Sequence, residues 1–224
     1  MTITYHPEVE QGSDAWSELR RGILTASEMR LIITPAKLQY ASNDKERGHL
    51  YELAAQRITG YVEPAYISDN MLRGMGDEIH AKAAYTKKYA SVDNCGFITN
   101  DRWGYTLGYS PDGLCGDNGL IECKSRKQKI QMETILTDTI PTENIIQLQT
   151  ELLVSEREWV DYVSYCGGMH LYVKRVFPDA VIQKAIVDAA NTFHEKLERI
   201  LKEYPVKSAN MPMTKRVVEE EMHL

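Results

Sequence analysis

The 224-residue sequence predicts an α/β fold with a mixed central β-sheet flanked by helices. The order of its segments supports this prediction: amphipathic helical segments come first, then short strand-like segments, then helices and strands in alternation. Glycine and Asn-Gly turns separate the strand-like segments. The chain contains no repeat, low-complexity segment or interdomain linker, so residues 1–224 are expected to form a single domain.

The first helices are predicted from their start and stop signals. Residues 13–21 are expected to form a short helix, with Ser13 or Asp14 as its cap and an apolar side formed by Trp16 and Leu19. The run Thr25-Ala-Ser-Glu28 has the form of a capping box, which predicts a second helix that continues until Pro35.

Longer helices are predicted in the next part of the chain. A polar loop is expected over residues 35–43, followed by a helix over 44–59 that Gly60 closes. A helix from about Asp69 to Ala90 is indicated by apolar residues at a period of four, namely Met71, Met75, Ile79 and Ala83.

The remaining elements alternate between strands and helices. In chain order they are strands near 92–99, 104–110 and 119–124, helices over 127–137 and 142–155, strands near 158–165 and 169–176, and a helix over 179–203. Gly167-Gly168 predicts a hairpin between the last two strands. A polar tail that contains Pro205 and Pro212 is expected over about 205–224.

The composition is that of a globular protein in a reducing compartment. Hydrophobic residues make up 43% and charged residues 26% of the chain, without an apolar run long enough for a membrane helix. The N-terminus lacks the basic and apolar regions of a secretion signal. The cysteines show no C-x-x-C pair, which predicts reduced thiols in a cytoplasm rather than a zinc site or a disulfide framework.

The formal net charge of −6 does not favour nucleic-acid binding by itself. A binding channel depends on the local field, however, and cations gather between Arg20 and Arg47 and between Lys124 and Lys129. Such clusters are also common on solvated faces, so they give only weak support to a DNA-binding surface.

The most informative segment runs from Gly108 to Lys124 and is predicted to contain a strand, a tight turn and a second strand. Residues i and i+2 of a strand share a face, so Glu122 and Lys124 point the same way, and a hairpin could bring Asp112 beside them. Two carboxylates and an ammonium at the end of a sheet suit a hard divalent cation with a water, as in metal-dependent phosphodiester hydrolases.

A simpler interpretation of the same residues is available. Pro111-Asp112-Gly113 is also an ordinary turn sequence, and Glu122 and Lys124 could lie on the solvent face of an amphipathic strand. The flanking Leu120, Ile121 and Cys123 indicate a buried strand, however, and charged groups in a buried strand need partners or a function.

The sequence resembles the phage lambda exonuclease and YqaJ-type viral recombinase family, which has the restriction-endonuclease-like PD-(D/E)xK nuclease core. The resemblance covers residues 10 to about 155 in ordered blocks. These are Glu10-Gln-Gly-Ser-Asp-Ala-Trp16, Leu19-Arg20, Gly22-Ile-Leu-Thr25-Ala-Ser27-Glu28, Gly76-Asp-Glu78, Ser110-Pro-Asp112-Gly-Leu, Gly119-Leu-Ile-Glu122-Cys-Lys124 and Ile146-Gln147-Leu-Gln149.

The resemblance implies a catalytic role for each residue of the central motif. Asp112 and Glu122 would be metal ligands, the carbonyl of Cys123 would complete one metal site, and Lys124 would orient or activate the attacking water. Glu78 matches a helix-borne acid that helps to hold a second metal or its water. Its alternative is an ion pair with Lys82 at i+4.

Two further assignments also come from the resemblance. Gln147 matches a glutamine near the catalytic lysine, although a plain polar surface residue is an alternative. Arg20, Thr25 and Ser27 match a pocket for the 5′-phosphate of the digested strand, and a helix N-terminus at residues 25–28 would suit an anion. Alternatively, Ser27 and Glu28 could only cap the helix and Arg20 could pair with an acid.

The implied activity is Mg²⁺-dependent 5′→3′ digestion of one strand of linear double-stranded DNA, with release of mononucleotides and a 3′ single strand left for recombination. Two Mg²⁺ ions are expected, with Mn²⁺ as a substitute. The resemblance further implies double-stranded DNA ends as substrate, a ring-shaped homotrimer, a single-strand annealing partner, no membrane association, and a phage or prophage gene expressed in a bacterial cytoplasm.

The sequence departs from the family pattern at Ser125-Arg126 and in the loop 34–43. These departures concern how the duplex enters rather than the chemistry. Two other functions therefore stay open at this point: another PD-(D/E)xK nuclease, such as an endonuclease or junction resolvase, and a non-catalytic DNA-binding recombination scaffold.

Overall fold

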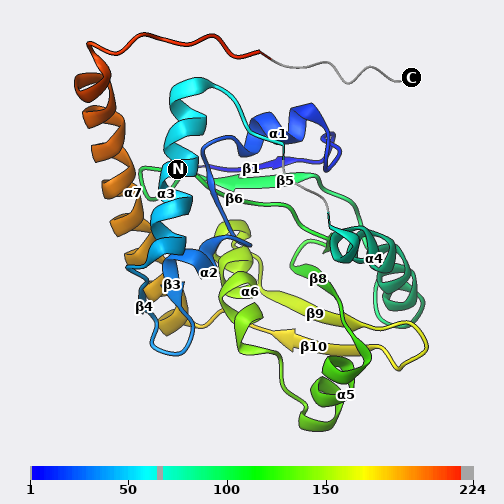
Figure 1. The fold of residues 1–224 in the computed structure, drawn as a ribbon. Coiled ribbons are helices and arrows are strands. Elements are labelled where there is room, and N and C mark those ends of the chain that lie inside the picture. Colours follow the sequence, from blue (N-terminus) through cyan, green and yellow to red (C-terminus); the bar gives the residue numbers. More distant parts are fainter. Residues whose placement is uncertain (1, 65–67, 218–224) are drawn as a thin grey trace, which may run out of the picture.

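The strands of the protein form two four-stranded mixed sheets and one short hairpin (Figure 1). The structure, a computed structural model, describes residues 2–64 and 68–217. The first sheet has the order β1 (Ile3–His6), β5 (Phe97–Asn100), β6 (Leu107–Tyr109), β2 (Leu24–Thr25). The second has the order β10 (Tyr172–Val176), β9 (Trp159–Tyr165), β8 (Gly119–Ser125), β7 (Gly113–Cys115). The predicted mixed α/β architecture is confirmed, with the strands shared between two sheets.

Helices cover both faces of the second sheet. In chain order they are α1 (Asp14–Arg20), α2 (Met29–Ile32), α3 (Asp44–Thr59), α4 (Asp69–Lys88), α5 (Gln128–Thr137), α6 (Thr142–Ser155) and α7 (Ala180–Ser208). The helix α4 packs on β8 and β9, while α6 packs on the opposite face of β9 and also contacts β5 and β6 (Figure 1). The chain between α2 and α3 forms the small hairpin of β3 (Ile33–Thr34) and β4 (Gln39–Tyr40).

Several predicted helix boundaries are confirmed by their capping contacts. The side chain of Ser13 accepts a hydrogen bond from the Trp16 N–H at 3.2 Å and begins α1. Gly60 ends α3 with φ of 64°, a left-handed conformation that glycine adopts without strain.

The predicted helix from Thr25 to Ile33 is mostly wrong, because only Met29–Ile32 are helical. Thr25 instead belongs to β2, which pairs in parallel with β6 through Leu24–Leu107 and Thr25–Gly108. One half of the capping box is present: the Glu28 carboxylate accepts hydrogen bonds from the Thr25 N–H and hydroxyl. The pairing of Thr25 with Gly108, which lies far along the chain, therefore outweighs the local signal for a helix start.

The helix α4 forms as predicted, but its buried face differs from the expected one. Met71, Met75 and Ile79 have exposed fractions of 51%, 60% and 69%, whereas Ala81 and Tyr85 are buried against β8 and β9. The period-four pattern identified the helix but not which of its sides meets the sheet. Small and hydroxyl-bearing side chains pack there instead.

A buried polar cluster attaches the C-terminal half of α4 to the second sheet. The Tyr85 hydroxyl donates to Asp161 Oδ2 at 2.7 Å, and Arg175 donates to both Asp161 carboxylate oxygens at 2.8 Å. The Arg175 guanidinium also lies over the Trp159 ring, 3.5 Å from its centroid. The buried Asp161 carboxylate is thus paired on both oxygens, as burial of a charge requires.

The last helix continues further than predicted. It runs through Pro205 to Ser208, so the polar tail does not begin at about residue 205. A proline so close to a helix end removes few hydrogen bonds. The final turn is supported by a Lys207–Glu203 ion pair at 2.9 Å and by a Ser208 hydroxyl bond to the Tyr204 carbonyl. Residues 218–224 of the predicted tail lie outside the described residues.

Two other features concern the cysteines and the length and polarity of the helices. Cys95, Cys115, Cys123 and Cys166 are all free thiols. None of the helices within residues 2–64 and 68–217 combines the length and the apolar character needed to cross a membrane.

Candidate active site

The β7–β8 hairpin brings Asp112 and Glu122 together. The antiparallel register pairs Gly113 with Ile121, so Asp112 and Glu122 face each other one residue further along. The Asp112 carboxylate accepts a hydrogen bond from the Cys123 N–H at 2.6 Å, which fixes it beside β8. The predicted pairing of the strand near 104–110 with that near 119–124 is wrong, because β6 lies in the first sheet and the short strand β7 pairs with β8 instead. The expected proximity of Asp112 to Glu122 is nevertheless present.

The alternation of side chains along β8 places its charged residues toward α6. Glu122 and Lys124 lie on the same face of the strand as the core residue Leu120, and the Lys124 ammonium lies 2.6 Å from Glu122 Oε1. Gln147 on α6 joins both groups, since its Nε2 donates to Glu122 Oε1 at 2.6 Å and its Oε1 accepts from Lys124 Nζ at 3.0 Å.

Glu78 reaches the same region from α4. It forms an ion pair with Lys82 at 2.6 Å, so the alternative contact considered for it is present. Its charge also contributes to the electrostatics of Asp112, which places it near the carboxylate pair. The turn of α4 that carries Glu78 is attached to β8 by a hydrogen bond from the Ser125 hydroxyl to the neighbouring Asp77 at 2.5 Å.

The site concentrates negative charge in a partly enclosed place. Burial raises the pKa of Asp112 well above its usual range, and the charges of Glu122 and Glu78 raise it further. Burial alone would lower the pKa of Lys124, but Glu122 and Asp112 outweigh it and raise that pKa, so the side chain is an ammonium. Carboxylates that repel one another in this way would be stabilised by a bound cation.

The donor atoms fit magnesium better than zinc. Within the part of the chain that the structure describes, no group of three or more His, Cys, Asp or Glu side chains is arranged to hold a metal ion. Magnesium needs only one or two protein carboxylates, because waters and phosphate oxygens fill its other positions. Burial, and then Asp112, raise the pKa of the Cys123 thiol, so it stays protonated and leaves the Cys123 carbonyl as the donor.

A cleft of about 650 Å³ opens onto these carboxylates. Asp112, Glu78 and Lys82 lie in its wall, opposite the N-terminal loop 7–11. The exposed side chains of Met75 and Ile79 on α4 form part of its rim. The acidic groups are therefore accessible to a large substrate from this side.

The residues predicted to bind a 5′-phosphate also lie together. Arg20 donates to the hydroxyls of Ser110 at 3.3 Å and Thr25 at 3.4 Å, and the Ser27 hydroxyl lies 3.3 Å from that of Thr25. The guanidinium is held over the Trp16 ring at 4.4 Å. Glu28 Oε1 lies 4.0 Å away, so the predicted alternative, an acidic partner for Arg20, is also present.

A helix N-terminus was expected to help this cluster attract a phosphate, and that expectation is wrong. The helix α2 has only four residues, so it offers no extended helix N-terminus at residues 25–28 to attract an anion. The donors come instead from side chains on α1 and at the ends of the parallel strands β2 and β6. Ser110 was part of the motif but had no predicted role, and only its position beside Arg20 identifies it.

One short loop connects the hydroxyl–arginine cluster to the carboxylates. Ser110 follows β6 in the first sheet and Asp112 precedes β7 in the second, so Ser110–Asp112 links the two sheets. Residues two apart lie at most about 7 Å from each other along a chain. The short loop therefore keeps Ser110 close to Asp112.

The basic run after Lys124 is not a uniform binding surface. The Arg126 side chain is only 14% exposed, and it donates to the Tyr162 hydroxyl at 2.9 Å and to the Asn144 side chain. It therefore attaches β8 to α6 and β9, while Lys127 and Lys129 face solvent.

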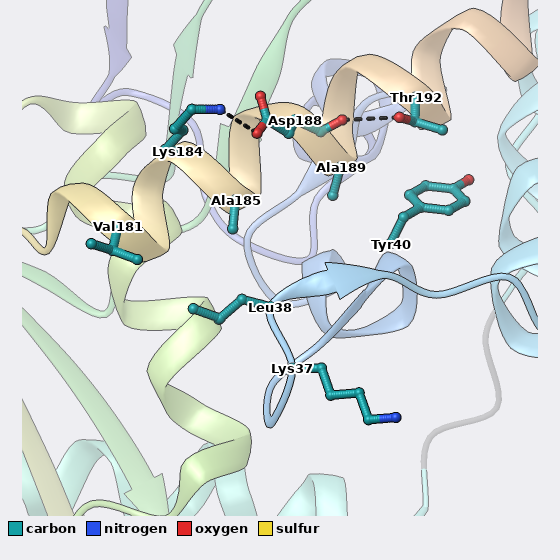
Figure 2. Close-up of a pocket in the computed structure, with 9 residues that line it drawn as sticks. All are labelled: Lys37, Leu38, Tyr40, Val181, Lys184, Ala185, Asp188, Ala189 and Thr192. Atoms are coloured by element: carbon teal, nitrogen blue, oxygen red, sulfur yellow. Dashed lines mark hydrogen bonds and ion pairs between the residues drawn. The ribbon is translucent and has the colours of Figure 1, made fainter.

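A second hollow of about 430 Å³ lies between the β3–β4 hairpin and α7 (Figure 2). Of its charged residues, Lys184 and Asp188 are paired with each other at 2.6 Å, and the Thr192 hydroxyl bonds the Asp188 carbonyl. The third charged residue is Lys37 of the hairpin. The hollow lies far from the carboxylates in the sequence and the fold, so we do not assign the active site to it.

Comparisons with known proteins identify the family of the chain. Residues 15–158 match the model of the YqaJ-like viral recombinase domain family. A structure of LHK-Exo in complex with dAMP is 30% identical, with a TM-score of 0.79, and the match covers 89% of this chain and 100% of that one. A structure of the alkaline exonuclease LHK-Exo from Laribacter hongkongensis is 29% identical, with a TM-score of 0.78 and the same coverage.

A phage-related exonuclease from Haemophilus somnus 129PT shares the fold at 12% identity, with a TM-score of 0.54 over 81% of this chain and 96% of that one. The search of curated proteins finds no match. The family match spans the α1 to α6 region, which contains every residue of the two clusters described above. This chain belongs to the YqaJ-like viral recombinase domain family, and it resembles the alkaline exonuclease LHK-Exo in sequence and fold.

Proposed function

We propose that this protein is a metal-dependent 5′→3′ exonuclease that digests one strand of linear double-stranded DNA from its 5′ end. It would release mononucleotides and leave 3′ single strands for recombination. The main support is that the short Ser110–Asp112 loop joins the arginine–hydroxyl cluster to the carboxylates. The complex of LHK-Exo with dAMP, a deoxynucleoside monophosphate, is consistent with such a product.

In this proposal, the arginine–hydroxyl cluster binds the terminal 5′-phosphate. The Arg20 guanidinium offers a forked donor for phosphate oxygens, and Ser27 and Ser110 add hydroxyl donors. The Thr25 hydroxyl, in contrast, already donates to Glu28. The stacking of Arg20 on Trp16 limits its rotation, so the phosphate is bound in a defined place. The next phosphodiester of the strand then lies against Asp112 and Glu122.

The carboxylates and Lys124 carry the chemistry in this proposal. Asp112, Glu122 and the Cys123 carbonyl would hold one Mg²⁺, and Glu78 would help to hold a second ion or its water, with Mn²⁺ as a substitute. Bound magnesium lowers the pKa of a water and stabilises charge on the phosphate. The Lys124 ammonium orients the attacking water, and Gln147 fixes Lys124 relative to Glu122.

The biological setting follows from the family and is part of the proposal. We expect a homotrimeric ring around double-stranded DNA, and a single-strand annealing protein that receives the 3′ strand. We also expect a phage or prophage gene and activity in the bacterial cytoplasm.

The proposal is tested with a linear duplex labelled at either the 5′ or the 3′ end, in the presence of Mg²⁺. The 5′ label is expected to appear first as a mononucleotide, while the 3′ label stays in a long strand. A covalently closed circular duplex serves as the control and should remain intact. Cutting of the circle would indicate an endonuclease or resolvase, and binding without cleavage would indicate a recombination scaffold; either result overturns the proposal.

Replacing Arg20 with alanine is expected to reduce the preference for 5′-phosphorylated over 5′-hydroxyl ends by about 10- to 100-fold, because one or two charge-assisted hydrogen bonds are lost. The measurement is the ratio of digestion rates on the two kinds of end. Arg21→Ala is the matched control, since Arg21 pairs with Glu18 at 2.9 Å outside the cluster. An unchanged ratio in Arg20→Ala would remove Arg20 from the phosphate pocket.

A further inference from the structure

Glu151 is a buried carboxyl group that the proposed reaction does not use. It lies on α6, one helical turn after Gln147, and is only 1% exposed. Its Oε1 has no hydrogen-bond partner among the described residues, and neither has the nearby buried Tyr109 hydroxyl. Its neighbours in the following turn are the core residues Leu152 and Val154. An apolar side chain would therefore be the more stable choice at this position.

The surroundings of Glu151 connect it with the candidate active site. Burial raises its pKa well above the usual range, and the charge of Glu122 raises it further, whereas Lys124 and a hydrogen bond from Gln147 act in the opposite direction. The carboxyl group lies one helical turn along α6 from Gln147, on the same side of the helix, and is buried. It cannot touch DNA because it is enclosed in the core.

The hydrogen bonds of the Gln147 amide indicate a role for the Glu151 carboxyl group. An amide has one oxygen and two N–H donors, and its two orientations differ only in which end faces which partner. Here the oxygen accepts from Lys124 and one N–H donates to Glu122, which leaves the second N–H free. Glu151 lies four residues further along α6, on the same side of the helix, and its Oε1 has no hydrogen-bond partner among the described residues, so it is the acceptor available to that N–H. If the amide were reversed, its oxygen would face the carboxylate oxygens of Glu122 and Glu151, and its NH₂ group would face the Lys124 ammonium. Both contacts would be unfavourable.

We propose that Glu151 is a positioning residue that holds the Gln147 amide in the orientation that presents its oxygen to Lys124. This inference rests on the proposed nuclease function. Glu151 acts through Gln147 and does not contact substrate. Its retention in the core is explained by a gain in the geometry of the site at a cost in stability.

The test compares Glu151→Leu with Glu151→Gln in the full-length protein. Glu151→Leu removes the acceptor and is expected to lower kcat by about 10-fold or more, with KM for DNA unchanged, as is typical when a residue that orients a catalytic group is lost. The melting temperature should not fall, because an unpartnered buried carboxyl group is replaced by an apolar side chain. Glu151→Gln keeps an acceptor oxygen and is expected to restore most of kcat.

The matched control is Gln149→Leu, because Gln149 is equally buried on α6 but bonds Phe177 and Asp179 away from the site. It should lower the melting temperature and leave kcat of the folded protein unchanged. The loss of kcat in Glu151→Leu should also vanish in a Gln147→Leu background, because the amide is then absent.

The outcomes separate this inference from the proposed function. Absence of metal-dependent cleavage by the unmodified protein contradicts the function itself. Normal cleavage by the unmodified protein together with full kcat in Glu151→Leu overturns only the role of Glu151. Additive losses in the double variant, or a fall in kcat that follows a fall in melting temperature, also overturn it, because both indicate a purely structural role.

Discussion

Replacing Lys124 with alanine is expected to reduce the rate of DNA cleavage by about 100- to 10,000-fold, the usual contribution of a positioned proton-transfer or water-orienting group. The reason is local: Lys124 is the ammonium that lies 2.6 Å from Glu122 and is also hydrogen-bonded to Gln147. The carboxylates remain, so DNA binding in the presence of Mg²⁺ should be retained. Single-turnover cleavage and a binding titration on the same linear duplex measure the two effects separately.

The control for this substitution is Lys129→Ala, which removes a nearby solvent-exposed lysine outside the carboxylate group. Its cleavage rate should stay close to that of the unmodified protein, which would exclude a general effect of lost positive charge. Near-normal cleavage by Lys124→Ala would contradict the catalytic role assigned to this residue.

Removal of divalent metal is expected to abolish digestion completely. The water that attacks the phosphodiester needs a cation to lower its pKa, and the described carboxylates offer no substitute for that charge. Digestion should return when excess Mg²⁺ or Mn²⁺ is added to the EDTA-treated protein, and Zn²⁺ should be a poor replacement because the donors are oxygens.

Thermal unfolding in EDTA provides the control for metal removal. The melting temperature should change little, because the fold is supported by two hydrophobic clusters and the Asp161 cluster rather than by the metal. Release of mononucleotides in fully chelated buffer would show that the proposed mechanism is wrong.

The sequence predicted those features that depend on local contacts. The Ser13 cap and the Gly60 terminator act within a few residues, so their signals are readable and the boundaries they predict are correct. The strand near 119–124 was likewise predicted, and strand alternation then places Glu122 and Lys124 on one face. The central part of the candidate site was therefore accessible without coordinates.

Features that depend on distant partners were missed. The short strand β7 (Gly-Leu-Cys) has no strong strand signal of its own and forms by pairing with β8. The strand β1 was also missed, although its Ile-Thr-Tyr-His sequence has high strand propensity, and it pairs with β5. The face by which α4 meets the sheet is decided by Asp161, which comes much later in the chain and bonds Tyr85. Glu151 was missed because only its burial and its neighbours distinguish it from an ordinary surface glutamate on an amphipathic helix.

The way β8 is attached to its surroundings has a consequence for how the site responds to distortion. This strand carries Glu122 and Lys124 itself, its Cys123 N–H fixes Asp112, and its Ser125 hydroxyl fixes the turn of α4 next to Glu78. A shift of β8 would therefore displace all these groups in concert and preserve their mutual spacing. Residues 69–72 at the start of α4, which are all exposed, lie in contrast outside that common frame.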